Sequence, residues 1–126
     1  MKRNTFSKEE RLCSKRLIDG LFRDGSSFFI YPYRVVFMRM EGVPTAQVLL
    51  SVSKRRFSRA VDRNLLKRRM REAYRLQKNE LLYPVIEGKP YGLVVAIQYV
   101  ADKLLDFPLM YQKMAAVLKR MHDEAL

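Results

Sequence analysis

The chain is organised around residues 54–78, which read KRRFSRAVDRNLLKRRMREAYRLQK. This stretch holds eleven basic and two acidic residues, so +9 of the chain's formal +12 lies within it. Ser58 is a suitable N-cap, no Gly or Pro follows until Pro84, and most residues between are good helix formers. We therefore predict a long helix that begins near Ser58 and ends near Leu82.

The predicted helix has a cationic face and an apolar face. At about 100° per residue, five basic side chains and one amide fall within an arc of roughly 140°: Arg63, Asn64, Lys67, Arg68, Arg71 and Arg75. The residues expected to pack follow helical spacing on another side: Leu66, Met70, Ala73 and Gln77. Like charges at i,i+4 repel by a few tenths of a kcal/mol per pair, so a bound polyanion explains this face better than simple solvation does.

Length and charge limit the class of protein. A chain of 126 residues suits one domain with a single core, and we find no internal repeat or domain boundary. A net charge of +12 and a pI near 10.1 predict a partner made of phosphates, either nucleic acid or an anionic membrane surface. No apolar run approaches the roughly 18 residues of a membrane span, and the first residues lack the apolar stretch of a signal peptide. We expect a cytosolic protein with no membrane partner.

The part of the chain before the basic helix predicts an arm and a short helix. Residues 1–11 are polar and are expected to form an extended arm. A first helix follows, with Ser14 as its N-cap and Gly25 as the residue that stops it. Gly20 weakens this helix relative to Ala, which suggests that another segment passes close by.

Three stretches have strand character. Residues 33–40 and 46–53 are rich in β-formers, and we expect them to pair as an antiparallel hairpin after an aromatic-rich connection at residues 26–32. Residues 91–100 form a nearly continuous apolar run, typical of a central strand covered on both faces. A last helix opens at residues 106–107. The order helix, strand, strand, basic helix, strand, helix predicts an α+β fold, with helices packed on a small mixed sheet of the four-stranded type.

No group of residues predicts an active site in this chain. The single histidine, His122, lies near the end, and the thirteen acidic residues are scattered without the paired carboxylates that a metal-dependent nuclease needs. One cysteine, Cys13, allows no internal disulfide, and one Cys with one His predicts no structural zinc site. We expect no cofactor or metal bound by the protein alone.

Aromatic residues before the hairpin add a second feature to the positive charge. Cations hold phosphates, while aromatic faces stack on unpaired bases, so the combination suits RNA with a single-stranded part. We expect most of these aromatic side chains to pack in the core and one or two to be available for stacking: Phe22, Phe28, Phe29, Tyr31, Tyr33 and Phe37.

Residues 60–72, AVDRNLLKRRMRE, resemble the signature A-V-x-R-N-R-x-K-R-x-x-R-E of the protein subunit of bacterial ribonuclease P. Residues 50–55, LSVSKR, resemble the L-S-V-S-K-K strand end of that family, and residues 18–27 resemble its F-x-x-V-F-x-x-G-x-S helix and turn. The match runs in order from residue 12 to about residue 122. It departs at Leu65, where the family has the second Arg of R-N-R. We expect this loss to reduce RNA affinity without abolishing the cationic face.

The resemblance implies a particular fold and a particular function. The fold would contain a left-handed strand-helix-strand crossover, against the usual right-handed rule. The chain would be a subunit of an endoribonuclease that removes the 5′ leader of precursor tRNA. A large catalytic RNA with bound Mg²⁺ would perform the cleavage, and no obligate protein partner is implied.

The resemblance also implies two sets of RNA-binding residues. Those that would contact the catalytic RNA lie in or beside the central helix: Arg59, Arg63, Asn64, Lys67, Arg68, Arg71 and Arg75. Those that would approach the leader of precursor tRNA come from the first helix and the strands: Ile18, Phe22, Val35, Phe37, Ser51, Ser53, Lys54 and Arg55.

Two other classes of protein remain alternatives. A ribosomal or general RNA-binding protein would share the basic α+β pattern but would have no role in tRNA maturation. A DNA-binding module could place the basic helix in the major groove. It is less favoured because Asn64 is the only obvious base-reading residue on the cationic arc.

Overall fold

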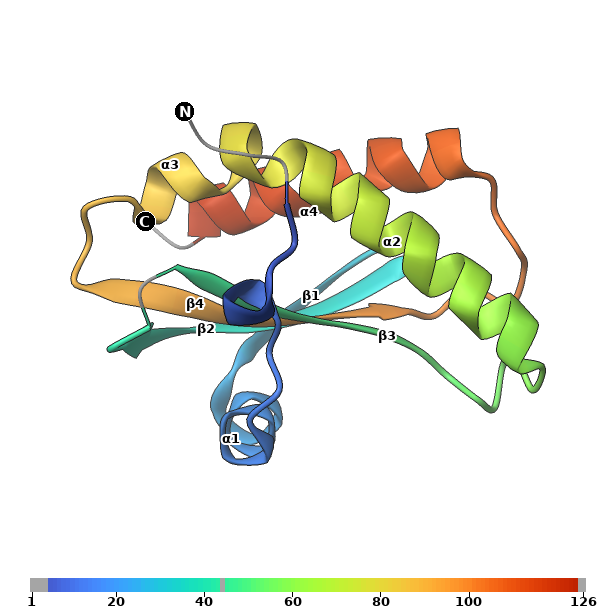
Figure 1. Ribbon diagram of the computed structural model, residues 1–126, viewed down its shortest axis with the longest axis horizontal. Coiled ribbons are helices and arrows are strands. Elements are labelled where there is room, and N and C mark those ends of the chain that lie inside the picture. Colours follow the sequence, from blue (N-terminus) through green and yellow to red (C-terminus); the bar gives the residue numbers. More distant parts are fainter. Residues whose placement is uncertain (1–4, 44, 125–126) are drawn as a thin grey trace.

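The computed structural model describes residues 5–43 and 45–124 and shows helices on both faces of one four-stranded sheet (Figure 1). The predicted α+β class is confirmed. The elements in chain order are the 3-10 helix η1 (Lys8–Glu10), α1 (Lys15–Asp24), β1 (Ser26–Ile30), β2 (Tyr33–Glu41), β3 (Ala46–Val52), α2 (Ala60–Leu81), α3 (Tyr83–Ile86), β4 (Tyr91–Tyr99) and α4 (Phe107–Glu124).

The sheet has the strand order β1-β2-β4-β3. β4 pairs antiparallel with β2 and parallel with β3, so the predicted hairpin between residues 33–40 and 46–53 is wrong. The reason is burial: residues 92–97 of β4 are all buried, and the most apolar strand takes the centre between its two neighbours. Residues 26–32 are also more than a connection, because β1 pairs antiparallel with β2 at the edge of the sheet.

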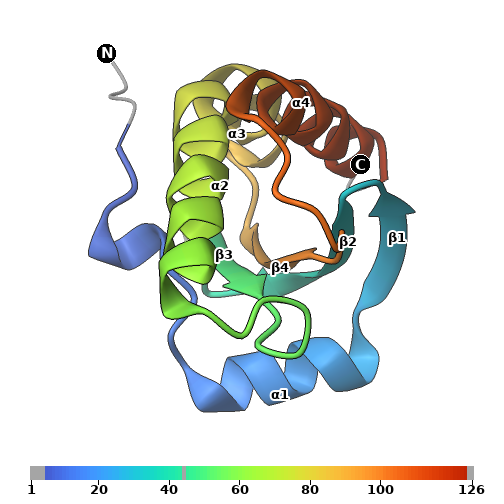
Figure 2. The same ribbon diagram turned by 90° about the vertical axis from the view of Figure 1, so that its right-hand side faces the viewer.

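The connection from β3 through α2 and α3 to β4 is a left-handed crossover. In Figure 1, β3 and β4 both run from left to right, β3 is nearer the viewer, and α2 returns above the sheet. Figure 2 looks along the strands and shows β3 to the left of β4 with α2 above β3. The two views together determine that the crossover is left-handed. The handedness implied by the family resemblance is therefore present, against the usual preference.

α2 and α4 close the upper face of the sheet. Leu66, Met70 and Ala73 of α2 are fully buried in one large apolar cluster with the strands and α4, as the helical spacing predicted. Tyr33 of β2 donates a hydrogen bond from its hydroxyl to the carbonyl of Met110 in α4, at 3.1 Å. Tyr33, Val35 and Phe37 of β2 are all buried on this face.

α1 covers the lower face only in part (Figure 2). Leu21 of α1 packs with Val36 of β2 and with Val94 and Ala96 of β4 in a second, smaller cluster. Ser14 caps the helix as predicted, since its hydroxyl accepts a hydrogen bond from the backbone amide of residue 17 at 3.3 Å.

Gly25 ends the first helix as predicted, whereas Gly20 does not have the predicted close neighbour. A Cβ on Gly20 would meet only the Arg23 side chain, at 3.8 Å, so no other segment passes close by. Gly25 follows the last helical residue but has an extended backbone with φ −74°. A Cβ there would lie 2.5 Å from the carbonyl oxygen of Leu21 and 2.9 Å from a methyl of Val36. Glycine is required at this position for space and not for a left-handed conformation.

The start of α2 also differs from the prediction. The helix begins at Ala60 with Arg59 in the N-cap position, and Arg59 makes no side-chain capping bond. The guanidinium of Arg63 instead donates hydrogen bonds to the carbonyls of Phe57 and Ser58, each at 2.8 Å. A basic side chain from the first turn therefore fixes the loop where a serine cap was expected.

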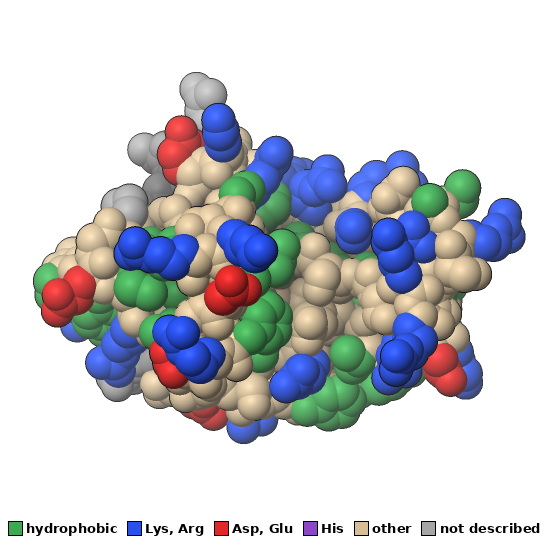
Figure 3. Space-filling view, turned by 90° about the horizontal axis from the view of Figure 1, so that it is seen from below, with side chains coloured by type: hydrophobic (Ala, Val, Ile, Leu, Met, Phe, Trp, Pro, Cys, Tyr) green, Lys and Arg blue, Asp and Glu red, His purple; other side chains and the backbone are tan. Residues whose placement is uncertain are grey.

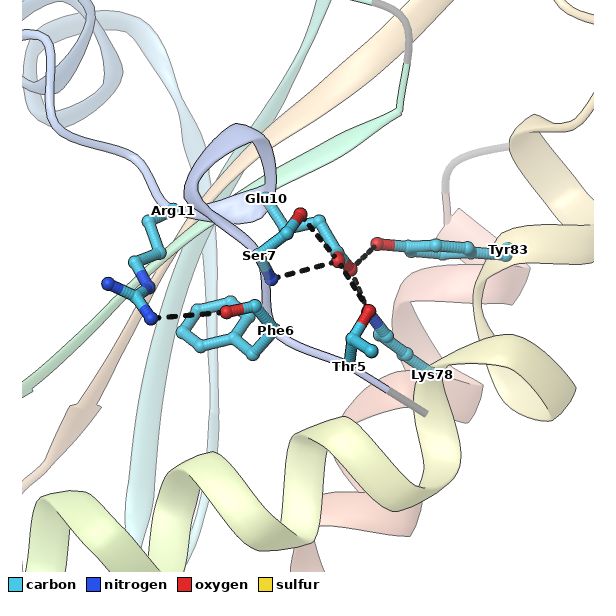
Figure 4. A network of polar contacts seen from close by, with 7 residues as sticks. All are labelled: Thr5, Phe6, Ser7, Glu10, Arg11, Lys78 and Tyr83. Atoms are coloured by element: carbon cyan, nitrogen blue, oxygen red, sulfur yellow. Dashed lines mark hydrogen bonds and ion pairs between the residues drawn. The ribbon is translucent and has the colours of Figure 1, made fainter. Parts of the chain in front are cut away.

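Residues 5–12, the N-terminal segment, pack beside α2 and the outer edge of β3. The amide of Leu12 donates a hydrogen bond to the carbonyl of Val48 at 3.0 Å, and residues 8–10 form a helical turn in place of the predicted extended arm. Figure 4 shows the buried carboxylate of Glu10, which accepts hydrogen bonds from the side chains of Lys78 and Tyr83. Residues 1–4 of the predicted arm lie outside the described residues.

Candidate nucleic-acid interface

The cationic face predicted for the central helix is open to solvent along the first half of α2. Arg59, Asn64, Arg68 and Arg71 are exposed, and Lys67 is half-buried. These five predicted residues are available to a ligand.

The other two predicted residues of α2 are bound within the protein. Arg63 holds the two carbonyls before the helix, and Arg75 pairs with Glu72 through a 2.6 Å contact. A guanidinium has five N–H donors, so both side chains can still meet a phosphate. Their contacts within the protein also stabilise α2 and the loop before it.

A cavity of about 280 Å³ lies between α2, β3 and the N-terminal segment, and three cationic side chains line it: Arg11, Lys67 and Arg71. Arg11 is fixed beside Phe6, whose carbonyl accepts a hydrogen bond from it at 3.2 Å and whose ring lies 5.7 Å from its guanidinium carbon. The sequence prediction missed Arg11 because residues 1–11 gave no indication of where they pack. Together with Arg59, Asn64, Lys67, Arg68 and Arg71, Arg11 forms what we call the helix surface.

The position of Arg11 depends on the neighbouring residue, Glu10. Lys78, which pairs with Glu10, is 1% exposed, and burial lowers the pKa of its amine to about 8. The Glu10 carboxylate also accepts the backbone amide of Ser7 at 3.1 Å and the Thr5 hydroxyl at 3.3 Å. This buried network anchors the N-terminal segment to α2, and so it keeps Arg11 beside Lys67 and Arg71.

A second charged region lies on the lower face, where β3 and β4 end. A cavity of about 480 Å³ there is lined by predicted leader-binding residues together with new ones: Ser51, Ser53 and Arg55, and also Arg56, Gln98 and Val100. Lys54 is exposed in the same loop. Figure 3 shows this face, on which Lys and Arg side chains are spread widely and include several at the right-hand end. The structure thus brings Ser51 of β3 and the predicted residues of the loop after it into one site.

The predicted residues of α1 lie on the same side of the sheet. Ile18 is half-buried against the lower apolar cluster, whereas Phe22 is 43% exposed. Phe22 can therefore contact a ligand, while Ile18 mainly packs α1 against the sheet.

The predicted leader-binding residues Val35 and Phe37 do not belong to this site. Both are buried in the upper cluster beneath α2 and α4. Side chains alternate between the two faces of a strand, so Arg34 and Val36 are the residues of β2 that point down. An assignment shifted by one residue along β2 exchanges the two faces of the sheet, and this accounts for the error.

Strand register places four side chains in one row across the lower face. Ser51 of β3 lies opposite Gln98 of β4, Gln98 opposite Arg34 of β2, and Arg34 opposite Phe29 of β1. Arg34 donates a hydrogen bond to the Gln98 side chain at 3.4 Å. We call Ser51, Gln98, Arg34 and Phe29 the cross-strand row. Sequence reasoning missed Gln98 and Arg34 because their alignment depends on pairings between distant strands.

The neighbouring row toward α1 has a different character. It consists of Leu49, Ala96, Val36 and Ser27, and its first three members pack in the lower apolar cluster under α1. Two residues along each strand separate the two rows. Over this short distance the lower face changes from apolar and covered by α1 to polar and open to solvent.

Of the six aromatic residues considered for stacking, three are buried in the core: Phe28, Tyr33 and Phe37. The other three are exposed: Phe22, Phe29 and Tyr31. This is one more than the sequence led us to expect.

The described residues contain no cluster of three or more His, Cys, Asp or Glu side chains that could hold a metal ion. Burial raises the pKa of the Tyr33 and Tyr74 hydroxyls, so these groups stay protonated. In the part of the chain that the structure describes, no helix is long and apolar enough to cross a membrane.

Comparisons with known proteins agree with this geometry. The family model Ribonuclease P matches residues 6–122. The ribonuclease P protein component of Porphyromonas gingivalis is 40% identical over 117 residues, covering 91% of this chain and 85% of the relative. That of Chlorobium phaeobacteroides is 33% identical over 129 residues, covering 95% and 88%. The solved RNase P protein of Thermotoga maritima superposes with a TM-score of 0.67 at 26% identity, covering 88% of this chain and 96% of the other. The chain therefore belongs to the ribonuclease P protein family.

Proposed function

We propose that this chain is the protein component of ribonuclease P, acting in the cytosol in the removal of 5′ leaders from precursor tRNA. It binds the catalytic RNA through the helix surface and the leader through the lower face of the sheet. The observation that carries this division is spatial. α2 lies above the sheet and the cross-strand row lies below it, so one small domain can contact two RNA segments at once.

The helix surface suits the phosphate backbone of a folded RNA. Arg11, Lys67 and Arg71 converge on one cavity, and Arg68 extends the charge along α2. Such contacts release counterions and give salt-dependent affinity without reading sequence. Asn64 is the one member of this surface that could accept as well as donate a hydrogen bond.

The lower face suits an unpaired strand. The serine hydroxyls and the Gln98 amide can donate and accept hydrogen bonds, while Arg34 and Arg55 can pair with phosphates. Exposed aromatic side chains on the same face can stack on bases that have no pairing partner. The 5′ leader is the single-stranded part of the substrate, and this face matches its chemistry.

Cleavage itself is proposed to take place in the catalytic RNA, with Mg²⁺ held through RNA. The protein would contribute by positioning the leader and by reducing the repulsion between two polyanions. Both effects should matter most when Mg²⁺ is scarce, since the cation screens the same repulsion.

The test is cleavage of a precursor tRNA at low Mg²⁺ by the ribonuclease P RNA of the same organism, with and without this protein. We expect mature 5′ ends in quantity only when both are present. Absence of stimulation would contradict the proposal and favour a general RNA-binding protein. Cleavage by the protein alone would contradict the assignment of catalysis to RNA.

A further inference from the structure

We propose that Phe29 and Tyr31, at the edge of the sheet, form a stacking platform for one unpaired base of the leader. This inference rests on the function proposed above and deepens it. It adds a base-binding subsite at the end of β1 and in the turn after it, which neither the sequence motif nor the family resemblance assigned.

The two aromatic rings form an exposed pair. Phe29 is 56% exposed and Tyr31 is 45% exposed. Their centroids lie 6.5 Å apart with an angle of 64° between the planes, so the edge of one ring meets the face of the other. This contact steadies the pair while each ring keeps surface open to solvent.

The pair stands at the end of the cross-strand row. The row begins at Ser51, beside the arginine-lined cavity, and passes through Gln98 and Arg34 to Phe29. Adjacent strands lie about 4.8 Å apart, so the row spans roughly 14 Å, a few nucleotides of single strand. Polar and cationic groups along the row can hold the backbone, and the aromatic end can receive a base.

The residue before Phe29 is buried, so exposure is not a general property of the side chains of β1. Phe28 points to the upper face and is 6% exposed, packed on Phe37 and beneath the guanidinium of Arg120. The two phenylalanines therefore offer a contrast within one strand, because one serves the core and the other meets solvent.

RNA is a better occupant for this platform than a second copy of the chain. β1 is an edge strand, which could in principle pair with another edge. Each copy, however, carries a net charge of +12, and Arg34 lies directly beside Phe29. An aromatic surface with a neighbouring cation complements a nucleotide and repels an identical surface.

The experiment uses the reconstituted holoenzyme and precursor tRNAs that carry 2-aminopurine at one leader position at a time. Stacking quenches the fluorescence of this base, so the position that reaches the platform should be quenched on binding. In Phe29→Leu, which keeps an apolar side chain without a planar face, the quenching at that position should disappear. The affinity for precursor with a full leader should also fall about tenfold. Phe29→Tyr should retain both properties.

The controls separate the possible failures. Phe22→Leu, an exposed aromatic on α1, should not abolish quenching at the same position. Stimulation of cleavage by the unaltered protein tests the proposed function. If the unaltered protein does not stimulate cleavage, the proposed function is wrong. If the unaltered protein stimulates cleavage but Phe29→Leu and Tyr31→Leu leave quenching and affinity unchanged at every position, the platform is wrong. Concentration-dependent dimerisation that Phe29→Leu abolishes would likewise overturn it in favour of pairing between edges.

Discussion

The helix surface and the cross-strand row both present positive charge, but they are assembled in different ways. The helix surface comes mostly from one helix, on which Lys67 and Arg71 lie one turn apart, with Arg11 added from the N-terminal segment. The cross-strand row takes one residue from each of four strands and ends in an exposed phenylalanine. The first is a line of cations, and the second is a sequence of different chemical groups.

This difference indicates what each surface can recognise. A line of cations binds phosphates wherever their spacing fits, and so it suits a large folded RNA. A row of hydroxyl, amide, guanidinium and aromatic groups can distinguish an unpaired strand from a duplex, because only an unpaired base has a face free to stack on an aromatic side chain. The predictions below test whether the two surfaces act separately.

The largest expected effect concerns the anchor of the helix surface. Glu10→Ala would leave Lys78 buried without its carboxylate partner, and the free energy of unfolding should fall by about 3 kcal/mol. Chemical denaturation followed by circular dichroism measures this change. Glu9→Ala, at the exposed neighbouring position, should leave stability unchanged. Equal stability of the two variants would mean that the N-terminal segment is not anchored through Glu10.

The next effect concerns the charge of the helix surface. The triple variant Lys67→Ala, Arg68→Ala, Arg71→Ala should bind the catalytic RNA more weakly. The slope of log affinity against log salt should shrink by about 0.7 to 0.9 for each lost phosphate contact. A matched triple variant at exposed lysines elsewhere, Lys89→Ala, Lys103→Ala, Lys119→Ala, should change the slope much less. Equal slopes in the two triple variants would contradict the assigned surface.

A smaller effect is expected on the lower face. Arg34→Gln removes one cation from the cross-strand row, so the holoenzyme should bind precursor tRNA more weakly and with a salt slope reduced by about 0.7. Its affinity for mature tRNA, which has no leader, should not change. Arg39→Gln, on the same strand at the opposite end of the sheet, is the control. Equal losses for precursor and mature tRNA would place Arg34 outside the leader site.

The smallest expected effect is a gain in affinity for the catalytic RNA. Leu65 is half-buried on α2 at the position where the family signature has arginine. Leu65→Arg should strengthen binding of the catalytic RNA less than tenfold and steepen the salt slope by at most about 0.9, since it adds one phosphate contact at most. Filter binding across a salt series measures both. Weaker binding in this variant would show that Leu65 packs against something the added charge disrupts.

The sequence predicted the helix surface better than the cross-strand row, because the first depends on one continuous segment and the second on pairing between distant strands. The cationic face of α2 depends on helical spacing within one continuous segment, so Lys67, Arg68 and Arg71 were placed without knowledge of the rest of the fold. The row depends on which strands pair and in which register. The sequence pattern favoured a hairpin where β4 in fact separates β2 from β3, and it treated β1 as a connection.

Two further errors share this cause. Val35 and Phe37 were assigned to the leader site although they face the core, because one residue of shift in β2 exchanges its two faces. Arg11 was missed because its partners on α2 lie more than fifty residues away along the chain. Long-range packing was therefore beyond what local pattern could predict.

The most direct test of the central claim compares one variant of each surface in two binding measurements. The helix variant is Lys67→Ala, Arg68→Ala, Arg71→Ala, and the row variant is Arg34→Gln with Phe29→Leu. The affinity of each for the catalytic RNA alone is measured first, and then the ratio of holoenzyme affinities for precursor and mature tRNA. We predict that the helix variant weakens binding to the catalytic RNA and leaves the ratio intact, whereas the row variant lowers only the ratio. If both variants change both quantities to the same extent, the two surfaces form a single RNA-binding site and the account is wrong.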